Sequence, residues 1–326
     1  MRKKIAILLC LIFVLAGALI GCTGGYAKLP KKNKFVLDNS WKQTFNDDFD
    51  TLNLDNWKVG DMAGNKHIRR AGIYTDSSDV LFAKDGNLFI RTLYKTSEYG
   101  TGWHTSWLES SVIKGEASTK NPNYKGLSQK YGYFEIRCKV PESVGIWSAF
   151  WMMPDGAKGM TNEDIISTGT DGLEVDIMES PYMYNDVTTL NTHVVHGDGY
   201  GAHLTSDKSA TYFVPKMYTQ FHTYAVEWNE SEYIFYVDGY ETFRTKYNKR
   251  TEDGGIEKTL GVSQVPEYLI LSVEVAGMEK DGVITPGKTT DANGNLVDFW
   301  CGNPDTNDKT KSYDFVVDYV KAYQKA

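Results

Sequence analysis

Three carboxylates lie within six residues near the middle of the chain, in the segment Glu174-Val-Asp-Ile-Met-Glu179. Polar residues that alternate with β-branched ones are typical of a half-buried strand. Successive side chains of a strand point to opposite faces, so Glu174 and Asp176 share one face. In a regular strand Glu179 would point to the apolar side, where an unpaired carboxylate is costly. We therefore predict a β-bulge near Met178 that returns Glu179 to the face of the other two acids.

Carboxylates crowded on one sheet face repel one another, which raises the pKa of at least one of them. A retaining glycosidase needs such a pair, an ionised nucleophile and a protonated acid about 5–5.5 Å apart. Along a strand, the Cα atoms of Glu174 and Glu179 would lie roughly 13 Å apart. The two side chains can meet only if the sheet is concave and both lean inward. An acidic edge strand or a calcium site would have a similar composition, so this segment alone leaves those interpretations open.

The segment resembles the active-site motif of glycoside hydrolase family 16, in its bulged form Glu-x-Asp-x-x-Glu. The similarity extends over most of the chain, in the order and spacing of that family, through Phe45–Phe49, Asp85–Leu88, Tyr131–Glu135, Gly145–Pro154, Phe221–Tyr224, Glu227–Trp228, Val237–Gly239 and Asp318–Val320.

This resemblance implies a retaining double displacement that needs no cofactor. Glu174 would be the nucleophile, Glu179 the general acid and then base, and Asp176 the residue that orients the nucleophile. Relatives often carry a structural calcium far from the cleft, and Asp318 would be the candidate ligand for such a site.

Most of the chain consists of short strand-like segments separated by Gly, Asn and Asp turns, with few amphipathic helices, which predicts an all-β sandwich. A length of 326 residues is normal for one large sandwich. Together with the resemblance, the pattern predicts a jelly-roll β-sandwich of two antiparallel sheets with a concave substrate groove.

Tryptophans are the first candidates for sugar contact, because their rings offer flat platforms. Trp147 and Trp151 share a strand face with Ala149, and the resemblance implies that this face is the floor of the groove. Trp103 lies in a segment rich in Gly, Thr and Ser, residues 99–111, which we expect to be a loop. We predict that Trp103 is a sugar platform and that Trp107 packs internally.

Four polar residues complete the predicted substrate site. The resemblance places Arg70 beside the non-reducing half of the cleft, and a surface ion pair is the alternative for it. His196 and Tyr200 match a His-x-Asp-Gly-Tyr pattern of a related subgroup. Glu274 lies opposite an apolar strand face, where laminarin-cleaving relatives commonly have a neutral residue. Glu274 could bind hydroxyls or raise the pKa of the acid, and it argues against a simple glucanase.

The first residues have the pattern of a secretory signal: Arg2, Lys3 and Lys4 precede an apolar run from Ile5 to Ile20. The run ends in Leu19-Ile20-Gly21-Cys22, which resembles a bacterial lipoprotein cleavage box; an ordinary signal cut nearby is the alternative. We expect a signal peptide at 1–21, a lipidated Cys22 with a tether to residue 36, and a catalytic domain at 37–326. The protein would be an exported, cell-surface bacterial lipoprotein that contacts the membrane through its lipid alone.

The net charge and the cysteines limit which binding partners, disulfides and metal sites the chain can have. The formal charge is −7, and removal of the three cations in residues 1–21 leaves a chain too acidic for nucleic acid but compatible with a neutral polysaccharide. Cys138 shares strand parity with core residues, and a Cys138–Cys301 disulfide would be allowed in an exported protein. No zinc or redox spacing is present. We expect a monomer.

The sequence therefore favours a retaining endo-β-glycanase that cleaves β-1,3- or β-1,3-1,4-glucan. An endo-β-galactosidase acting on galactan or poly-N-acetyllactosamine glycans is the main alternative, and a transglycosylase is another. A surface lectin on the same fold is the rival outside the enzymes, although a lectin would not need all three acids.

Overall fold

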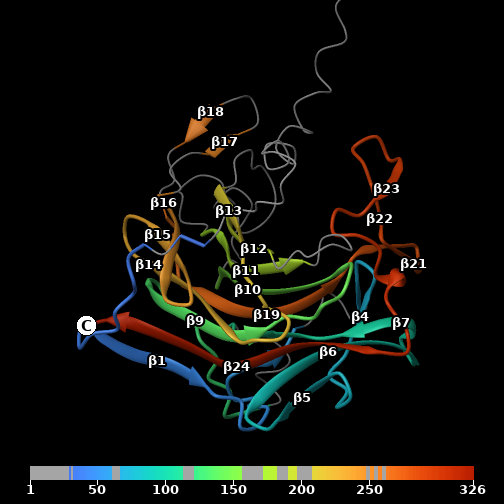
Figure 1. The fold of residues 1–326 in the computed structure, drawn as a ribbon, viewed down its shortest axis with the longest axis horizontal. Helices are drawn as coiled ribbons and strands as arrows, with labels where there is room; N and C mark the ends of the chain where they lie inside the picture. The colour runs from blue at the N-terminus through green and yellow to red at the C-terminus, as the bar shows by residue number, and fades with distance from the viewer. Residues whose placement is uncertain are drawn as a thin grey trace, which may run out of the picture.

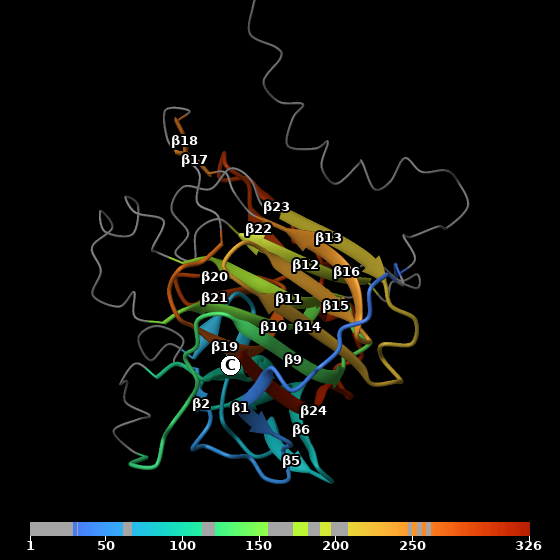
Figure 2. The same cartoon turned by 90° about the vertical axis from the view of Figure 1, so that its left-hand side faces the viewer.

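The computed structural model describes residues 29–30, 32–60, 67–112, 121–155, 172–181, 190–196, 208–246, 250–252, 256–258 and 262–326, with only the backbone described at 181, 190–196, 208, 250–252 and 256–258. These residues form two large β-sheets stacked face to face (Figures 1 and 2). A 3-10 helix, η1 (Pro304–Thr306), is the one helical element among them. The predicted two-layer, all-β arrangement is confirmed.

The seven-stranded sheet carries the acidic segment. Its strands run in the order β13 (Lys208–Phe213), β12 (Leu190–His196), β11 (Glu174–Pro181), β10 (Ile146–Pro154), β19 (Glu267–Val275), β8 (Trp107–Glu109) and β2 (Lys58–Val59). All neighbours in this sheet are antiparallel.

The eleven-stranded sheet forms the other layer. Its main path is β16 (Tyr240–Thr245), β15 (Tyr233–Val237), β14 (His222–Trp228), β9 (Gly132–Lys139), β24 (Ser312–Lys325), β6 (Asn87–Ser97), β7 (Gly100–Thr105), β4 (Gly72–Tyr74) and β3 (Ile68–Arg69), with β1 (Trp41–Asp47) on β24 and β5 (Leu81–Lys84) on β6. Its pairs are antiparallel except β4 and β7, which are parallel.

Three hairpins complete the described fold: β17 (Arg250–Glu252) with β18 (Ile256–Lys258), β20 (Gly277–Lys280) with β21 (Val283–Pro286), and β22 (Lys288–Thr290) with β23 (Leu296–Asp298). The last two follow β19 directly. In Figures 1 and 2 the β22–β23 hairpin rises past the seven-stranded sheet, on the side away from the eleven-stranded sheet.

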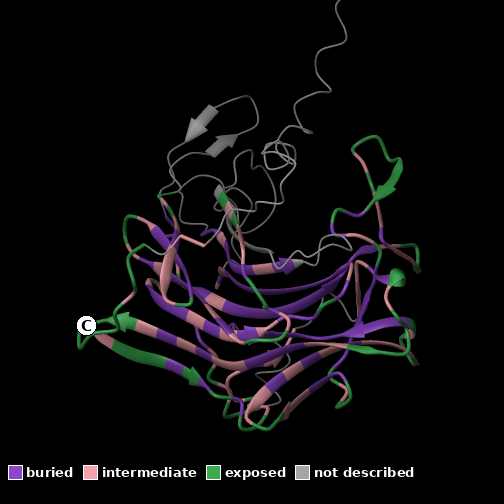
Figure 3. Ribbon diagram, in the orientation of Figure 1, coloured by how far each residue is buried: buried purple, intermediate pink, exposed green. Residues whose placement is uncertain are grey.

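The main core lies between the two sheets, and Figure 3 shows buried residues concentrated on the facing strands. Alternate residues of each strand supply it, because one face of each sheet points inward. On β19 these are Leu269, Leu271, Val273 and Val275, all 0% exposed. Each fully buried aliphatic side chain contributes about 1.5–3 kcal/mol of transfer free energy, so this face fixes the register that aims the opposite face outward.

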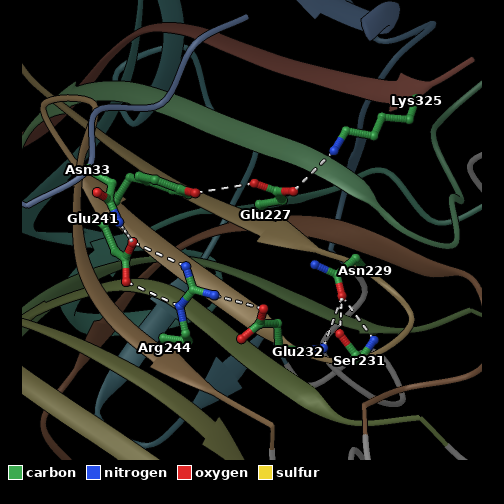
Figure 4. A network of polar contacts seen from close by, with 9 residues as sticks. Asn33, Glu227, Asn229, Ser231, Glu232, Glu241, Arg244 and Lys325 are labelled. Carbon is green, nitrogen blue, oxygen red and sulfur yellow. Dashed lines mark hydrogen bonds and ion pairs between the residues drawn. The ribbon is translucent and has the colours of Figure 1, made fainter. Parts of the chain in front are cut away.

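The segment before β1 pairs with the edge strand β16 and packs across a cluster on the eleven-stranded sheet that is separate from the main core. The ring of Phe35 stacks on Tyr133 with centroids 3.8 Å apart. Figure 4 shows the neighbouring network, in which Asn33 donates to Glu241 and Arg244 bridges Glu241 and Glu232. Described residues before 37 therefore pack against the sheet, and Leu29 also contacts the main core.

Candidate active site

Strand β11 contains the predicted bulge. Against β10, Trp151 is opposite Asp176 and Phe150 is opposite Met178, so Ile177 is the extra residue. The β12 side shows the same shift between Asp176 and Glu179. Ile177 and Met178 are consecutive, yet both are 0% exposed and belong to the core between the sheets. The bulge therefore interrupts the alternation and returns Glu179 to the face of Asp176.

We call this face of the seven-stranded sheet the carboxylate face, because Glu174, Asp176 and Glu179 share it. Cross-strand partners identify its other residues. Glu179 is opposite Ala149, which is opposite Ser272 of β19. Asp176 is opposite Trp151 and is 3% exposed, whereas Glu174 and Glu179 are partly exposed. Two accessible acids thus flank one nearly buried acid.

Both predicted tryptophans of β10 lie on the carboxylate face. Trp151 is 9% exposed, and its indole N–H donates to Ser272 Oγ at 3.0 Å. Trp107 contacts its ring edge-on at 5.2 Å and is 5% exposed, in agreement with its predicted packing role. Trp147 is also 5% exposed, and its ring contacts those of Phe299 and Trp300 at centroid distances of 5.8 and 5.4 Å.

The prediction that Trp103 is a sugar platform is wrong. Its segment forms strands β7 and β8 instead of a loop. The Trp103 side chain is 1% exposed in the main core, and its N–H donates to Asp305 at 2.9 Å. A buried ring with its polar atom satisfied has no face for a ligand.

Arg70 and Glu274, which the sequence suggests separately, form one ion pair. Arg69 joins the pair, with its Nε 2.8 Å from Glu274 Oε1, while the Nε of Arg70 contacts Oε2. Glu274 lies opposite Trp147 on the carboxylate face, and its side chain is 6% exposed. Glu274 is therefore a shielded, doubly paired carboxylate and not a free acid beside Glu179.

Sequence reasoning missed Trp300 and Arg69. Trp300 is 49% exposed beside Trp147, so it is the accessible ring at this end of the carboxylate face. The argument used for Trp103, a tryptophan in a segment without strand pattern, applies to Trp300 and would have found it. Arg69 could have been suspected as the neighbour of Arg70, but no local pattern pairs it with residue 274.

A known protein family matches the part of the chain that contains the three acids. Residues 116–293, more than half of the chain, match the family described as Glycosyl hydrolases family 16, and the three acids of β11 lie inside the matched region. The chain belongs to glycosyl hydrolase family 16. The resemblance predicted from the acidic motif is confirmed.

Individual relatives with named activities are similar to this chain over only part of their length. A beta-glucanase of Rhodothermus marinus is 28% identical over 197 residues, covering 60% of this chain and 58% of that protein. A keratan-sulfate endo-1,4-beta-galactosidase of Sphingobacterium multivorum is 32% identical over 163 residues, or 49% of this chain and 34% of that protein. This chain therefore spans less than two thirds of either relative.

A solved family 16 structure shares the fold. The crystal structure of SCLam, a non-specific endo-beta-1,3(4)-glucanase, aligns with a TM-score of 0.63 at 21% identity. The alignment covers 93% of this chain and 98% of that one. The jelly-roll sandwich predicted from the sequence is thereby confirmed.

The predicted substrate residues His196 and Tyr200 cannot be placed by their side chains, because these lie outside the described residues. The backbone of His196 pairs with Glu174, but its side chain lies outside the described residues, as does all of Tyr200.

The suggested disulfide is wrong: Cys138 and Cys301 are both free and buried. They belong to separate clusters, Cys138 in the main core and Cys301 beside Trp147 and Phe299.

The calcium suggestion for Asp318 is not supported by its surroundings, because Arg137 forms an ion pair with the carboxylate. No group of three or more His, Cys, Asp or Glu side chains in the described ranges could hold a metal.

Cys22 and the predicted signal peptide lie outside the described residues. The described part of the chain contains no helix with the length and hydropathy needed to cross a bilayer.

Glu267, at the start of β19, is a fully buried acid close to the residue that precedes β11. The backbone N–H of Leu173 donates to its Oε1 at 3.4 Å. Burial raises the pKa of Glu267 to about 8, and hydrogen bonds from Ser263 and Leu173 oppose the rise. Since the folded pKa exceeds the unfolded one, the contribution of Glu267 to stability is complete below about pH 4.5, falls between pH 4.5 and about 8, and changes little above that.

We expect Glu267→Gln to remove this pH dependence. Between pH 4.5 and 8 the wild-type free energy of unfolding should fall by roughly 3–5 kcal/mol more than that of the variant. Urea denaturation at pH 5 and pH 8 measures the difference. Glu142→Gln, which changes an exposed residue, should follow the wild-type curve. Parallel curves for wild type and Glu267→Gln would contradict the assignment of a buried neutral acid.

Proposed function

We propose that the protein is a retaining endo-β-glycanase that hydrolyses internal bonds of β-1,3- or mixed β-1,3-1,4-glucan. The observation that carries this proposal is the bulge of β11, which returns Glu179 to the face that Glu174 and Asp176 already share, within a family 16 domain. The beta-glucanase relative and the glucanase with the same fold support the choice of glucan.

The reaction would take two steps at one anomeric carbon. In the first, the Glu174 carboxylate attacks that carbon while Glu179 protonates the departing glycosidic oxygen, and a glycosyl-enzyme ester forms. In the second, Glu179 removes a proton from water, the water oxygen attacks the same carbon, and Glu174 leaves. The nearly buried Asp176, two residues from Glu174 on the same face, orients the nucleophile.

A polysaccharide screen tests the proposal. β-1,3-glucan, mixed-linkage glucan, agar-type galactan and poly-N-acetyllactosamine are each incubated with the protein, and new reducing ends are counted. We expect oligosaccharides from a glucan, with the β-anomer formed first by proton NMR. An α-anomer as first product would exclude Glu174 as nucleophile, and cleavage of none of the four polymers would count against the glycanase.

An endo-β-galactosidase is the second candidate. The keratan-sulfate endo-1,4-beta-galactosidase relative favours it, as does Glu274, at a position where laminarin-cleaving relatives commonly have a neutral residue. In the same screen this function would appear as cleavage of the galactan or of poly-N-acetyllactosamine in preference to both glucans.

We also propose that the protein is an exported lipoprotein, modified at Cys22, whose domain stays in the aqueous phase as a monomer. The Leu-Ile-Gly-Cys box supports this. Cys22→Ser should release the protein from the membrane fraction or leave it unprocessed, whereas Cys10→Ser should change nothing. Detergent-phase partitioning measures both, and unaltered partitioning of Cys22→Ser would contradict the anchor.

A further inference from the structure

Two arginine side chains cover the tryptophan rings at one end of the carboxylate face. The guanidinium carbon of Arg69 lies 5.0 Å from the ring centroid of Trp107, and that of Arg70 lies 5.3 Å from the ring of Trp147. Both rings are 5% exposed, whereas the two arginine side chains are 40% and 38% exposed. A sugar that reaches Trp107 or Trp147 therefore meets guanidinium groups, and the exposed ring at this end is that of Trp300.

Glu274 holds both arginines in place through their Nε atoms. Within the described part of the chain, no residue accepts a hydrogen bond from the terminal Nη atoms of Arg69 or Arg70. One carboxylate that faces two guanidinium groups leaves one positive charge in excess. Cation–π contact with the rings attracts the guanidinium groups without neutralising that charge.

This cluster lies close to the proposed catalytic acid. Trp107, Ser272, Ala149 and Glu179 are successive cross-strand partners, and Glu274 is two residues beyond Ser272 on β19. Strand spacings put the Cα atoms of Glu274 and Glu179 roughly 12 Å apart. The thiol of Cys301 reflects this proximity: burial raises its pKa, Arg70 lowers it, and Glu274 and Glu179 both raise it.

We propose that Arg69 and Arg70 bind an anionic substituent of the glycan, a sulfate ester or a carboxylate, beside the site of cleavage. The planar guanidinium fork matches the oxygen geometry of both anions, and hydrogen bonds between ions are about twice as strong as neutral ones. This proposal rests on the glycanase function and defines its substrate class. The two arginines contrast with the chain's net charge of −7, which repels an anionic polymer from the rest of the protein.

The alternative is that the three residues only join β3 to β19. A purely structural ion pair would not discriminate between charged and neutral polymers. Removing one arginine alone would leave the buried Glu274 carboxylate with one cationic partner instead of two, which is destabilising. The informative variant is therefore Arg69→Gln/Arg70→Gln/Glu274→Gln, which removes all three charges and keeps polar side chains. Arg91→Gln/Asp314→Asn is the control, because it removes a two-point ion pair between β6 and β24, away from the carboxylate face.

The experiment measures binding in a Glu179→Gln background by affinity electrophoresis. The probes are β-1,3-glucan and agarose-type galactan, each native and chemically sulfated, and β-1,3-glucan oxidised to carry C6 carboxylates. For at least one backbone we expect an anionic form to bind about tenfold tighter than its native form at low salt. This preference should weaken at high salt, persist in the control, and disappear in the triple variant. Preference for sulfate or for carboxylate identifies the anion.

Equal binding of native and anionic polymers, or a preference that survives in the triple variant, would overturn the proposal. If the triple variant does not fold, Arg69→Gln alone leaves Glu274 paired with Arg70 and must reduce the preference. Cleavage of native polymers by the wild-type protein is scored separately. Failure of the glycanase and failure of the anion site therefore give different results.

Discussion

Glu179→Ala should lose about 10²–10⁴-fold of its activity on polysaccharide, the range expected when a general acid is removed. A polymer has a poor leaving group, so protonation by Glu179 limits its cleavage. An aryl β-glycoside with a very acidic phenol needs little such help, and the variant should still form the glycosyl-enzyme from it. Without a general base that intermediate should persist, and added azide should attack it and restore turnover.

Glu174→Ala should behave differently, because it lacks the atom that attacks the anomeric carbon. We expect no glycosyl-enzyme from the aryl glycoside and no label from a mechanism-based fluoroglycoside, measured by intact-protein mass spectrometry. Glu142→Gln, an exposed change away from β11, should retain wild-type rates. Labelling of Glu174→Ala at the wild-type rate would show that the two roles are assigned wrongly.

The parity of side chains made much of this site predictable. Glu179 could join Asp176 only through an extra residue, and Ile177 with Met178 supplies it. The apolar face of β19 likewise placed Glu274 on the opposite side. These inferences succeed because alternation is a local property of a strand, and because one sheet face must be buried.

The failures concern contacts between residues distant in sequence. Trp103 is in a segment of Gly, Thr and Ser that resembles a loop, yet pairing with β6 and β4 makes it a core strand. Cys138 and Cys301 satisfy the composition rule for a disulfide, but they belong to different clusters. Arg69 and Glu274 are brought together by the packing of β3 near β19, which no local pattern encodes.

Deleting Met178 should leave a folded protein with reduced but measurable activity on polysaccharide. The deletion yields Glu-Val-Asp-Ile-Glu, in which the three acids alternate regularly onto one face. Opposite β10, Asp176 keeps Trp151, Ile177 takes the place of Met178 against Phe150, and the last acid keeps Ala149. The ladder beyond the bulge therefore stays in register. Loss of one core side chain should cost about 2–5 kcal/mol of stability.

Deleting Ile177 and Met178 together should abolish cleavage of the polymer, by at least about 10³-fold. The acid that follows Asp176 would then be opposite Phe150 and point into the core between the sheets, where an unpaired charge is costly. Circular dichroism reports whether each variant folds. The aryl glycoside reports a surviving nucleophile without its acid, so a folded double deletion could still release phenol from it. If the double deletion folds and cleaves polysaccharide better than the single one, side-chain parity does not control Glu179, and the bulge does not aim it.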